Sequence, residues 1–213
     1  MSKGQDNKKF WQRYAPIYWM FIRSAGKAYD GIAERISSYI KKDSKVLELA
    51  CGTGEFTLRL AGKCESWLAT DFSENMLKEA EVAYEKQRIN IEGLIFEQQD
   101  ATNLPYENES FDAVMIANAL HIMPEPERAL AQIRRVLKPG GLLFAPTFMY
   151  QEGSGFLIRS GILKVFGFQA YMSSTAKEFV EFIEKQGFQV LECDIINCKV
   201  SPLCCLIARK REV

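Results

Sequence analysis

Val46-Leu47-Glu48-Leu49-Ala50-Cys51-Gly52-Thr53-Gly54 is an apolar run that leads directly into a turn with two glycines. The apolar residues after this turn, within 56–61, are spaced as in a short helix that ends near Gly62. The order strand, glycine turn, helix is typical of the first unit of an open parallel sheet. In such sheets a ligand binds outside the carboxyl ends of the strands, and the first glycine turn is the usual place for a cofactor.

The alternation of strands and helices continues along the chain. Apolar runs predict further strands at 66–70, 94–96, 113–117 and 142–148. Helical periodicity predicts helices at 29–40, at 76–84 behind the N-cap candidate Ser73, and from Pro126 to a stop at 139–141. Near-continuous apolar strands that alternate with helices require a mostly parallel sheet that is covered on both faces.

The chain ends in a predicted hairpin. Two apolar runs, 188–196 and 203–208, are joined only by residues 197–202, which are fewer than the dozen or so that a parallel crossover needs. A helix capped by Thr175, with Glu178 three residues later, precedes them. The sequence therefore predicts an α/β fold, a doubly wound, mostly parallel seven-stranded sheet that ends in an antiparallel hairpin.

We expect a single domain over residues 1–213, because no repeat, low-complexity tract or linker divides the chain. Two segments stand outside the alternation. Residues 10–22 are dense in aromatic side chains, and residues 155–168 form an apolar insertion after the fifth strand. We predict that both cover the ligand cleft, as an N-terminal lid and helix over 1–42 and a lid insertion over 155–170.

The composition excludes several classes of protein. Lysine and arginine number 27, as do aspartate and glutamate, so the formal net charge is zero and nucleic acid is not an expected partner. Hydrophobic residues make up 47% and charged residues 25% of the chain, which is typical of a folded globular domain. The expected partner is a small-molecule substrate, and the sequence leaves the oligomeric state open.

Cysteine spacing and the N-terminus indicate a cytoplasmic protein. The six cysteines contain no C-x-x-C pair, so we predict no metal site and a reducing compartment. The N-terminus lacks the apolar region of a secretory signal. No apolar stretch approaches the roughly 20 residues that span a bilayer, so we expect no transmembrane segment. The aromatic N-terminus leaves peripheral contact with a membrane surface as an alternative.

Three acidic residues, Glu48, Asp71 and Asp100, lie at the carboxyl ends of the first three predicted strands and should converge on one cleft. Asp71 follows Gly54 by 17 residues, near the roughly 20 expected for an acid that binds ribose hydroxyls. A pyrophosphate would be repelled by Glu48, and Thr57 occupies the place of the third glycine of a dinucleotide motif. These acids favour a cofactor with a ribose and an ammonium group but no phosphate. An NAD-binding oxidoreductase is the alternative.

Five segments together resemble the class I S-adenosylmethionine (SAM)-dependent methyltransferases. The resemblance extends from about residue 30 to the terminal hairpin. It is greatest to the type 11 small-molecule branch, similar to the ubiquinone and menaquinone methyltransferases, and it implies a Rossmann-like methyltransferase fold. The segments are 46–54, Thr-Asp-Phe-Ser at 70–73, Gln-Asp-Ala-Thr-Asn-Leu-Pro at 99–105, Ser-Phe-Asp-Ala-Val at 110–114 and Arg-Val-Leu-Lys-Pro-Gly-Gly at 135–141.

The resemblance implies a contact for each part of SAM, whose product after methyl transfer is S-adenosylhomocysteine (SAH). The family most often has glycine where this chain has Ala50. The implied cofactor residues are Glu48, Ala50, Gly52, Gly54 and Asn118 for the methionine part, Asp71 for the ribose, and Phe72, Asp100 and Ala101 for the adenine.

The acceptor side has fewer sequence signals. His121 is the sole histidine and follows the fourth predicted strand, so it is a candidate general base. Tyr14 and Tyr18 are candidates for closing over the cofactor or binding a substrate. Cys204 and Cys205 are adjacent on a predicted strand, so their side chains point to opposite faces and cannot share one ligand.

The leading hypothesis is a SAM-dependent methyltransferase that acts on a small, apolar or aromatic acceptor. Because the methyl group of a sulfonium is already activated, such an enzyme mainly holds the nucleophile in line with it. A non-catalytic SAM-binding module is a second alternative. The sequence leaves the acceptor atom, whether oxygen, nitrogen, sulfur or carbon, undetermined.

Overall fold

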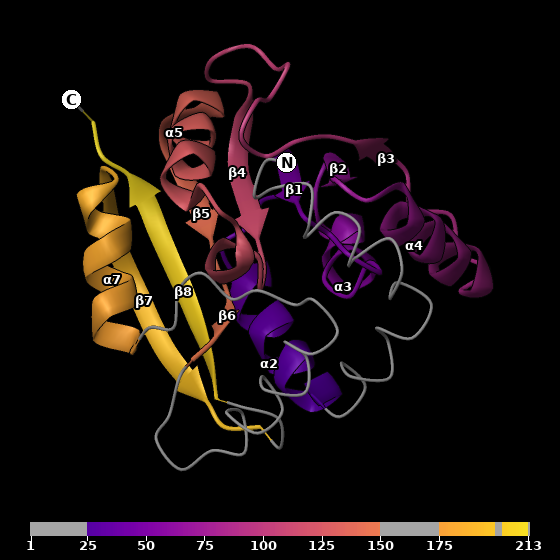
Figure 1. The fold of residues 1–213 in the computed structure, drawn as a ribbon. Helices are drawn as coiled ribbons and strands as arrows, with labels where there is room; N and C mark the ends of the chain where they lie inside the picture. The colour runs from indigo at the N-terminus through magenta and orange to yellow at the C-terminus, as the bar shows by residue number, and fades with distance from the viewer. Residues whose placement is uncertain (1–24, 150–174, 199–201, 213) are drawn as a thin grey trace.

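A computed structural model describes residues 25–149, 175–198 and 202–212 (Figure 1). The elements follow the predicted alternation. In chain order they are α2 (Gly26–Ser37), β1 (Lys45–Leu49), α3 (Thr57–Leu60), the 3-10 helix η2 (Ala61–Lys63), β2 (Ser66–Asp71), α4 (Glu74–Lys86), β3 (Leu94–Gln98), β4 (Phe111–Ile116), the 3-10 helix η3 (Leu120–Ile122), α5 (Pro126–Val136), β5 (Leu137–Phe144), β6 (Thr147–Phe148), α7 (Ala176–Lys185), β7 (Phe188–Ile196) and β8 (Leu203–Lys210).

The sheet is parallel from β3 through β2, β1 and β4 to β5. Strand β8 then runs antiparallel to β5, and β7 pairs antiparallel with the other side of β8. Strand β6 pairs with β8 beyond the end of β5, so it continues the β5 row. The predicted α/β class, the mostly parallel sheet and the terminal hairpin are therefore confirmed. The described residues form eight strands arranged in seven rows.

The extra strand comes from a break in the fifth predicted strand, which was expected to run without interruption over 142–148. Pro146 has no backbone N–H to give to a ladder, and the strand stops at Phe144 and resumes at Thr147. The preceding helix also ends earlier than the expected stop at 139–141. Helix α5 ends at Val136, and β5 begins at the next residue.

Local capping explains where the helices begin. The Ser73 side chain accepts a hydrogen bond from the backbone nitrogen of Met76 at the start of α4. Thr175 and Glu178 form a complete capping box at the start of α7. Pro126 occupies the first turn of α5, where its missing N–H costs no hydrogen bond. All three predicted starts are confirmed.

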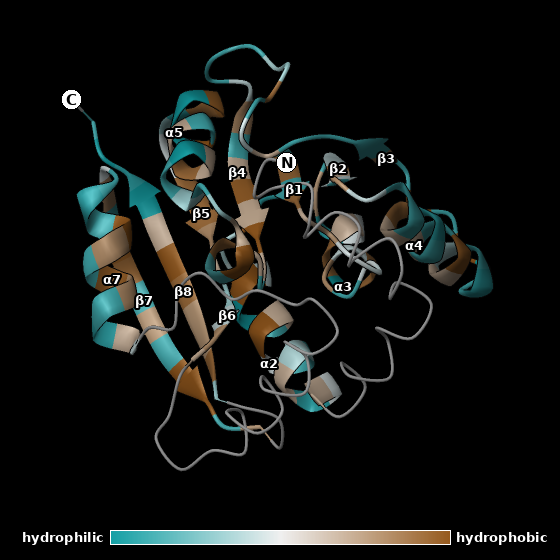
Figure 2. Cartoon of the chain, in the orientation of Figure 1, coloured by the Kyte–Doolittle hydropathy of each residue, from teal (hydrophilic) through white to brown (hydrophobic). Residues whose placement is uncertain are grey.

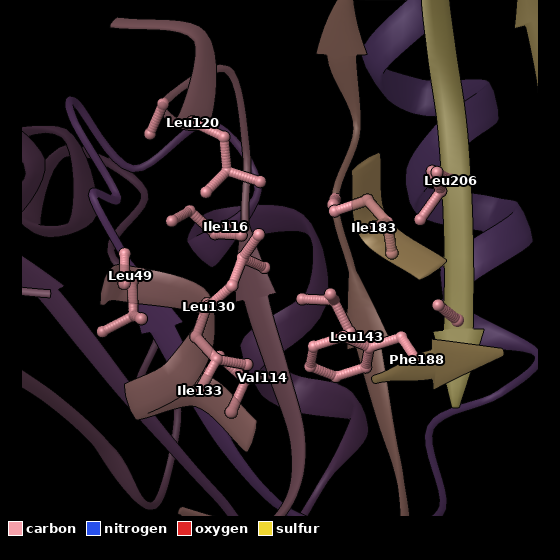
Figure 3. Close-up of a cluster of buried hydrophobic side chains, with 14 of the residues drawn as sticks. Leu49, Val114, Ile116, Leu120, Leu130, Ile133, Leu143, Ile183, Phe188 and Leu206 are labelled. Carbon is pink, nitrogen blue, oxygen red and sulfur yellow. The ribbon is translucent and has the colours of Figure 1, made fainter. Parts of the chain in front are cut away.

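Two apolar clusters hold the layers together. Helices α5 and α7 cover one face of the sheet, and α2, α3 and α4 cover the other. In the first cluster Leu130 and Ile133 of α5 pack near Val114, while Ile183 of α7 lies near Leu206 (Figure 3). Figure 2 shows the hydrophobic side of α7 turned toward the sheet and its hydrophilic side turned outward. Because β1, β2, β3 and β4 run parallel, their carboxyl ends lie at one edge of the sheet.

None of the helices in the described ranges is long and apolar enough to cross a membrane.

Candidate cofactor and acceptor site

The turn after β1 follows a left-handed path. Ala50, Gly52 and Gly54 have φ values of 52°, 57° and 83°. Gly54 also packs closely, since a Cβ added there would lie 3.4 Å from the Cβ of Ala80 in α4. A side chain at a left-handed position costs roughly 1 kcal/mol, so Ala50 carries strain that the glycine common in the family would avoid.

Asp71 ties the end of β2 to this turn. One carboxylate oxygen accepts a hydrogen bond from the backbone nitrogen of Gly52 at 2.9 Å, and the other accepts one from that of Ser73 at 2.8 Å. Burial raises the pKa of Asp71 to about 6, while these backbone hydrogen bonds act in the opposite direction. The predicted ribose acid therefore lies beside the predicted cofactor turn.

Glu48 lies beneath the turn rather than open to solvent. Only 1% of this residue is exposed, and one carboxylate oxygen accepts hydrogen bonds from the Thr57 hydroxyl at 2.6 Å and the Trp67 indole nitrogen at 2.7 Å. Burial raises the pKa of Glu48 to about 7 against the effect of these two donors. Glu48 thus links β1 to α3 and β2, a contact set that the sequence did not indicate.

The Thr53 hydroxyl is the clearest sign that the turn is built for a ligand. Its oxygen is buried and has no hydrogen-bond partner among the residues that the structure describes. A buried polar atom normally has a partner, and an exception calls for an explanation. A polar cofactor against the backbone of Gly52 and Gly54 would supply one, so the residues present fit SAM.

Of the three adenine candidates, Phe72 directly after β2 and Asp100 just after β3 lie at the surface. Phe72 is 40% exposed, and its carbonyl accepts a hydrogen bond from the side chain of Gln98 at 2.9 Å. Asp100 is exposed and accepts both the backbone and hydroxyl hydrogen bonds of Thr102 at one oxygen. Ala101 beside it is buried. Register pairing of Asp71 with Gln98 brings this end of β3 next to the end of β2.

Asn118 joins three parts of the fold. Its φ of 51° is left-handed, and its backbone nitrogen donates to the carbonyl of Pro146 at 2.8 Å. The side-chain nitrogen donates to the Tyr29 hydroxyl at 2.8 Å, and the side-chain oxygen accepts from the backbone nitrogen of Phe148 at 3.1 Å. The predicted methionine-side residue therefore connects β4 to α2 and β6, and Tyr29 was missed because it lies far away in sequence.

His121 lies on η3, just past Asn118, and is partly exposed. Its Nδ1 is 3.1 Å from the hydroxyl oxygen of Thr147 on β6. Burial lowers the pKa of His121 to about 4, so the ring is neutral at neutral pH. The sequence pattern gave no indication of Thr147 as its partner.

The remaining candidates divide into two groups. Tyr14, Tyr18 and the apolar insertion at 155–168 lie outside the described residues. Cys204 and Cys205 belong to opposite apolar clusters, so the prediction that they face opposite sides of the sheet is confirmed.

Comparisons with known proteins indicate the family of the chain. Residues 47–145 match the family described as "Methyltransferase domain". Demethylmenaquinone methyltransferase of Staphylococcus carnosus (strain TM300) is 32% identical over 167 residues, which cover 74% of this chain and 66% of that protein. The chain thus spans just under two thirds of that relative. The enzyme of the same name from Staphylococcus aureus (strain MRSA252) is 32% identical over 179 residues, which cover 76% of this chain and 71% of that protein.

Solved structures share the fold. Magnesium protoporphyrin IX methyltransferase from Synechocystis PCC 6803, with bound SAH, matches with a TM-score of 0.69 and 16% sequence identity. The match covers 92% of this chain and 88% of that one.

Proposed function

This chain belongs to the class I SAM-dependent methyltransferases of the type 11 kind, and from that premise we propose that its acceptor is a small apolar or aromatic molecule. The relatives named above are demethylmenaquinone methyltransferases, so an aromatic quinol is the first acceptor class to consider. Ile122 and Met123, which follow His121, are apolar and only partly buried, and they support an apolar acceptor side.

We further propose how the described residues hold SAM. Asp71 keeps the turn at Gly52 in place and gives its remaining oxygen lone pairs to the ribose hydroxyls. Thr53 and the turn backbone bind the polar end of the methionine part, with Asn118 beside them, while Glu48 supports the turn from beneath. Phe72, Asp100 and Ala101 border the adenine. The Asp71–Gly52 hydrogen bond, beside the unpartnered Thr53 hydroxyl, is the observation that carries this assignment.

Bound SAM supplies a methyl group on a positively charged sulfur, which is already activated for displacement. The chain's own residues then need to align the acceptor and exclude water, which are two general sources of rate enhancement. Buried apolar groups such as Leu120 and Met149 near His121 and Thr147 serve the second purpose.

Calorimetry and a methyl-transfer assay test the proposal separately. SAH should bind to the full chain, and NAD should not. Purified protein with isotope-labelled SAM is then assayed with a reduced naphthoquinone, a simple phenol, a thiol and a hydrophilic amine, with mass spectrometry of the products. Methylation of the quinol or phenol supports the proposed class. Binding of SAH with methylation of the hydrophilic amine alone would show that the acceptor class is wrong.

A further inference from the structure

The contact between His121 and Thr147 indicates which ring nitrogen of His121 carries the proton. The two atoms, Nδ1 and Oγ1, are 3.1 Å apart, which is hydrogen-bond distance. Thr147 is 4% exposed, and it is paired with Cys204 of β8, so its position is fixed by the sheet. Within the described part of the chain, the imidazole of His121 is the only hydrogen-bond partner of this hydroxyl.

Either Nδ1 of His121 or the hydroxyl of Thr147 can be the donor in this hydrogen bond. If Nδ1 donated to Thr147, the hydroxyl hydrogen would remain buried without an acceptor in the described structure, which is rare in folded proteins. If the hydroxyl donates to Nδ1, both groups are satisfied. A neutral imidazole that accepts at Nδ1 carries its hydrogen on Nε2. The second arrangement therefore leaves Nε2–H as a donor on a partly exposed ring.

We propose that Thr147 holds His121 as the Nε2–H tautomer, so that His121 donates a hydrogen bond to an oxygen atom of the methyl acceptor. Thr147 is then a positioning residue, and His121 is a substrate-binding residue that selects acceptors with a carbonyl or phenolic oxygen. This inference rests on the proposed function, because it assigns a contact to the acceptor of that reaction. No proton is transferred in this role, in contrast to the general base that the sequence suggested.

The electrostatic environment agrees with a donor. Partial burial of the ring lowers its pKa, which keeps it uncharged and makes it a weak base for an acceptor proton. An uncharged N–H can still bind a carbonyl oxygen. Such a contact orients an aromatic acceptor that otherwise offers only apolar surface to apolar neighbours such as Ile122 and Met123.

The tautomer can be measured directly and without any activity assay. His121 is the sole histidine, so the imidazole signals of the full chain in a long-range 1H–15N spectrum belong to it alone. We expect a single Nε2–H form in the wild type and in Thr147→Ser. In Thr147→Val, which has nearly the same shape but no hydroxyl, a mixture of tautomers should appear. An Nδ1–H form in the wild type, or no change in Thr147→Val, would overturn the proposal.

Substitution of His121 separates a donor from a base. The Gln amide can donate a hydrogen bond but cannot accept a proton at neutral pH. With the best acceptor of the panel, His121→Ala should raise the KM for that acceptor on the order of tenfold, the effect of one lost hydrogen bond. His121→Gln should recover most of this loss, and the SAH affinity of both variants should stay within about twofold. If His121→Gln is as impaired as His121→Ala, chiefly in kcat, His121 acts as a general base and the proposed role as a hydrogen-bond donor is wrong.

The spectrum tests the position of the ring proton without any methyl transfer, so it can fail separately from the proposed function. If no phenol or quinol is methylated, the proposed acceptor class is wrong, while the spectrum still decides whether Thr147 fixes the ring. If methylation occurs but the spectrum shows an Nδ1–H ring, the function stands and the assigned donor is wrong.

Discussion

The carboxylate of Asp71 accepts a hydrogen bond from the backbone nitrogen of Gly52 at 2.9 Å, so the end of one strand holds the turn that follows its neighbour. The same carboxylate accepts from Ser73 at the start of α4. A single side chain thus connects two strand ends and a helix. Loss of Asp71 should therefore affect both the shape of the cofactor turn and its direct contacts.

Replacement of Asp71 by Ala is expected to weaken SAH binding at least about tenfold, because hydrogen bonds to a charged group contribute roughly 1.5–3 kcal/mol each. Titration calorimetry measures the change. Asp100→Ala is the matched comparison. The Asp100 carboxylate lies at the neighbouring strand end and has no contact with the turn backbone among the described residues, so this variant should lose less SAH affinity. Equal SAH affinity in wild type and Asp71→Ala would show that the ribose assignment is wrong.

Residue 50 offers a test of backbone strain. Its φ of 52° places an alanine in a conformation that favours glycine. Ala50→Gly should therefore raise the free energy of unfolding by about 0.5–1 kcal/mol, measured by urea denaturation. Ala83→Gly, within α4, is the control and should lower it by about 1 kcal/mol. A loss of stability in both variants would mean that Ala50 is not strained.

The elements that the sequence predicted share a local cause. Apolar runs specify β1, β2 and β4, and the side chains of Ser73 and Thr175 specify helix starts within their own segments. The short connection 197–202 requires the hairpin for a simple geometric reason. Such features depend on neighbours in sequence, so periodicity and loop length suffice to find them.

The contacts that the sequence did not reveal depend on tertiary arrangement. Tyr29 reaches Asn118 across 89 positions, and His121 reaches Thr147 across 26. Neither pair has a periodic signal, because each forms only when the sheet edge and its covering elements are in place. The acidic residue at the end of β2 could be found from its spacing to the turn, but its backbone partner could not. Residue types indicated a candidate site, whereas the contacts between its residues could be found only in the structure.

The hydrogen bond between Asn118 and Tyr29 should be measurable as a coupling energy. Tyr29→Phe removes the hydroxyl, and Asn118→Gly removes the amide while keeping the left-handed backbone accessible. In a double-mutant cycle by urea denaturation, the two changes should couple by about 1 kcal/mol. The control is a second cycle that combines Tyr29→Phe with Glu81→Gln, at an exposed position on α4. These two changes should not couple. Strictly additive effects of Tyr29→Phe and Asn118→Gly would contradict a stabilising contact.

Glu48 links the stability of the fold to pH. Its pKa is about 7 in the folded chain, above the ordinary value of 4.5 that the unfolded chain should show. Between these two values the folded state holds a proton that the unfolded state has released. The free energy of unfolding should therefore fall as pH rises from about 4.5 to 7 and then stay level, by about 3 kcal/mol in total. Asp71, with a pKa of about 6, adds a change of the same sign at lower pH.

Glu48→Gln should remove most of this pH dependence, because the amide oxygen can still accept from Thr57 and Trp67 but the side chain no longer ionises. At pH 5 the variant and the wild type should have similar free energies of unfolding, and at pH 7.5 the variant should be more stable by up to about 3 kcal/mol. Urea denaturation at both pH values measures these free energies of unfolding. Glu81→Gln, at an exposed position, is the control and should leave the pH dependence of the wild type unchanged. A wild type that gains stability between pH 5 and 7, with Glu48→Gln losing that gain, would mean that Glu48 is ionised in the folded state. The hydrogen bonds from Thr57 and Trp67 would then outweigh the effect of burial on the pKa of Glu48.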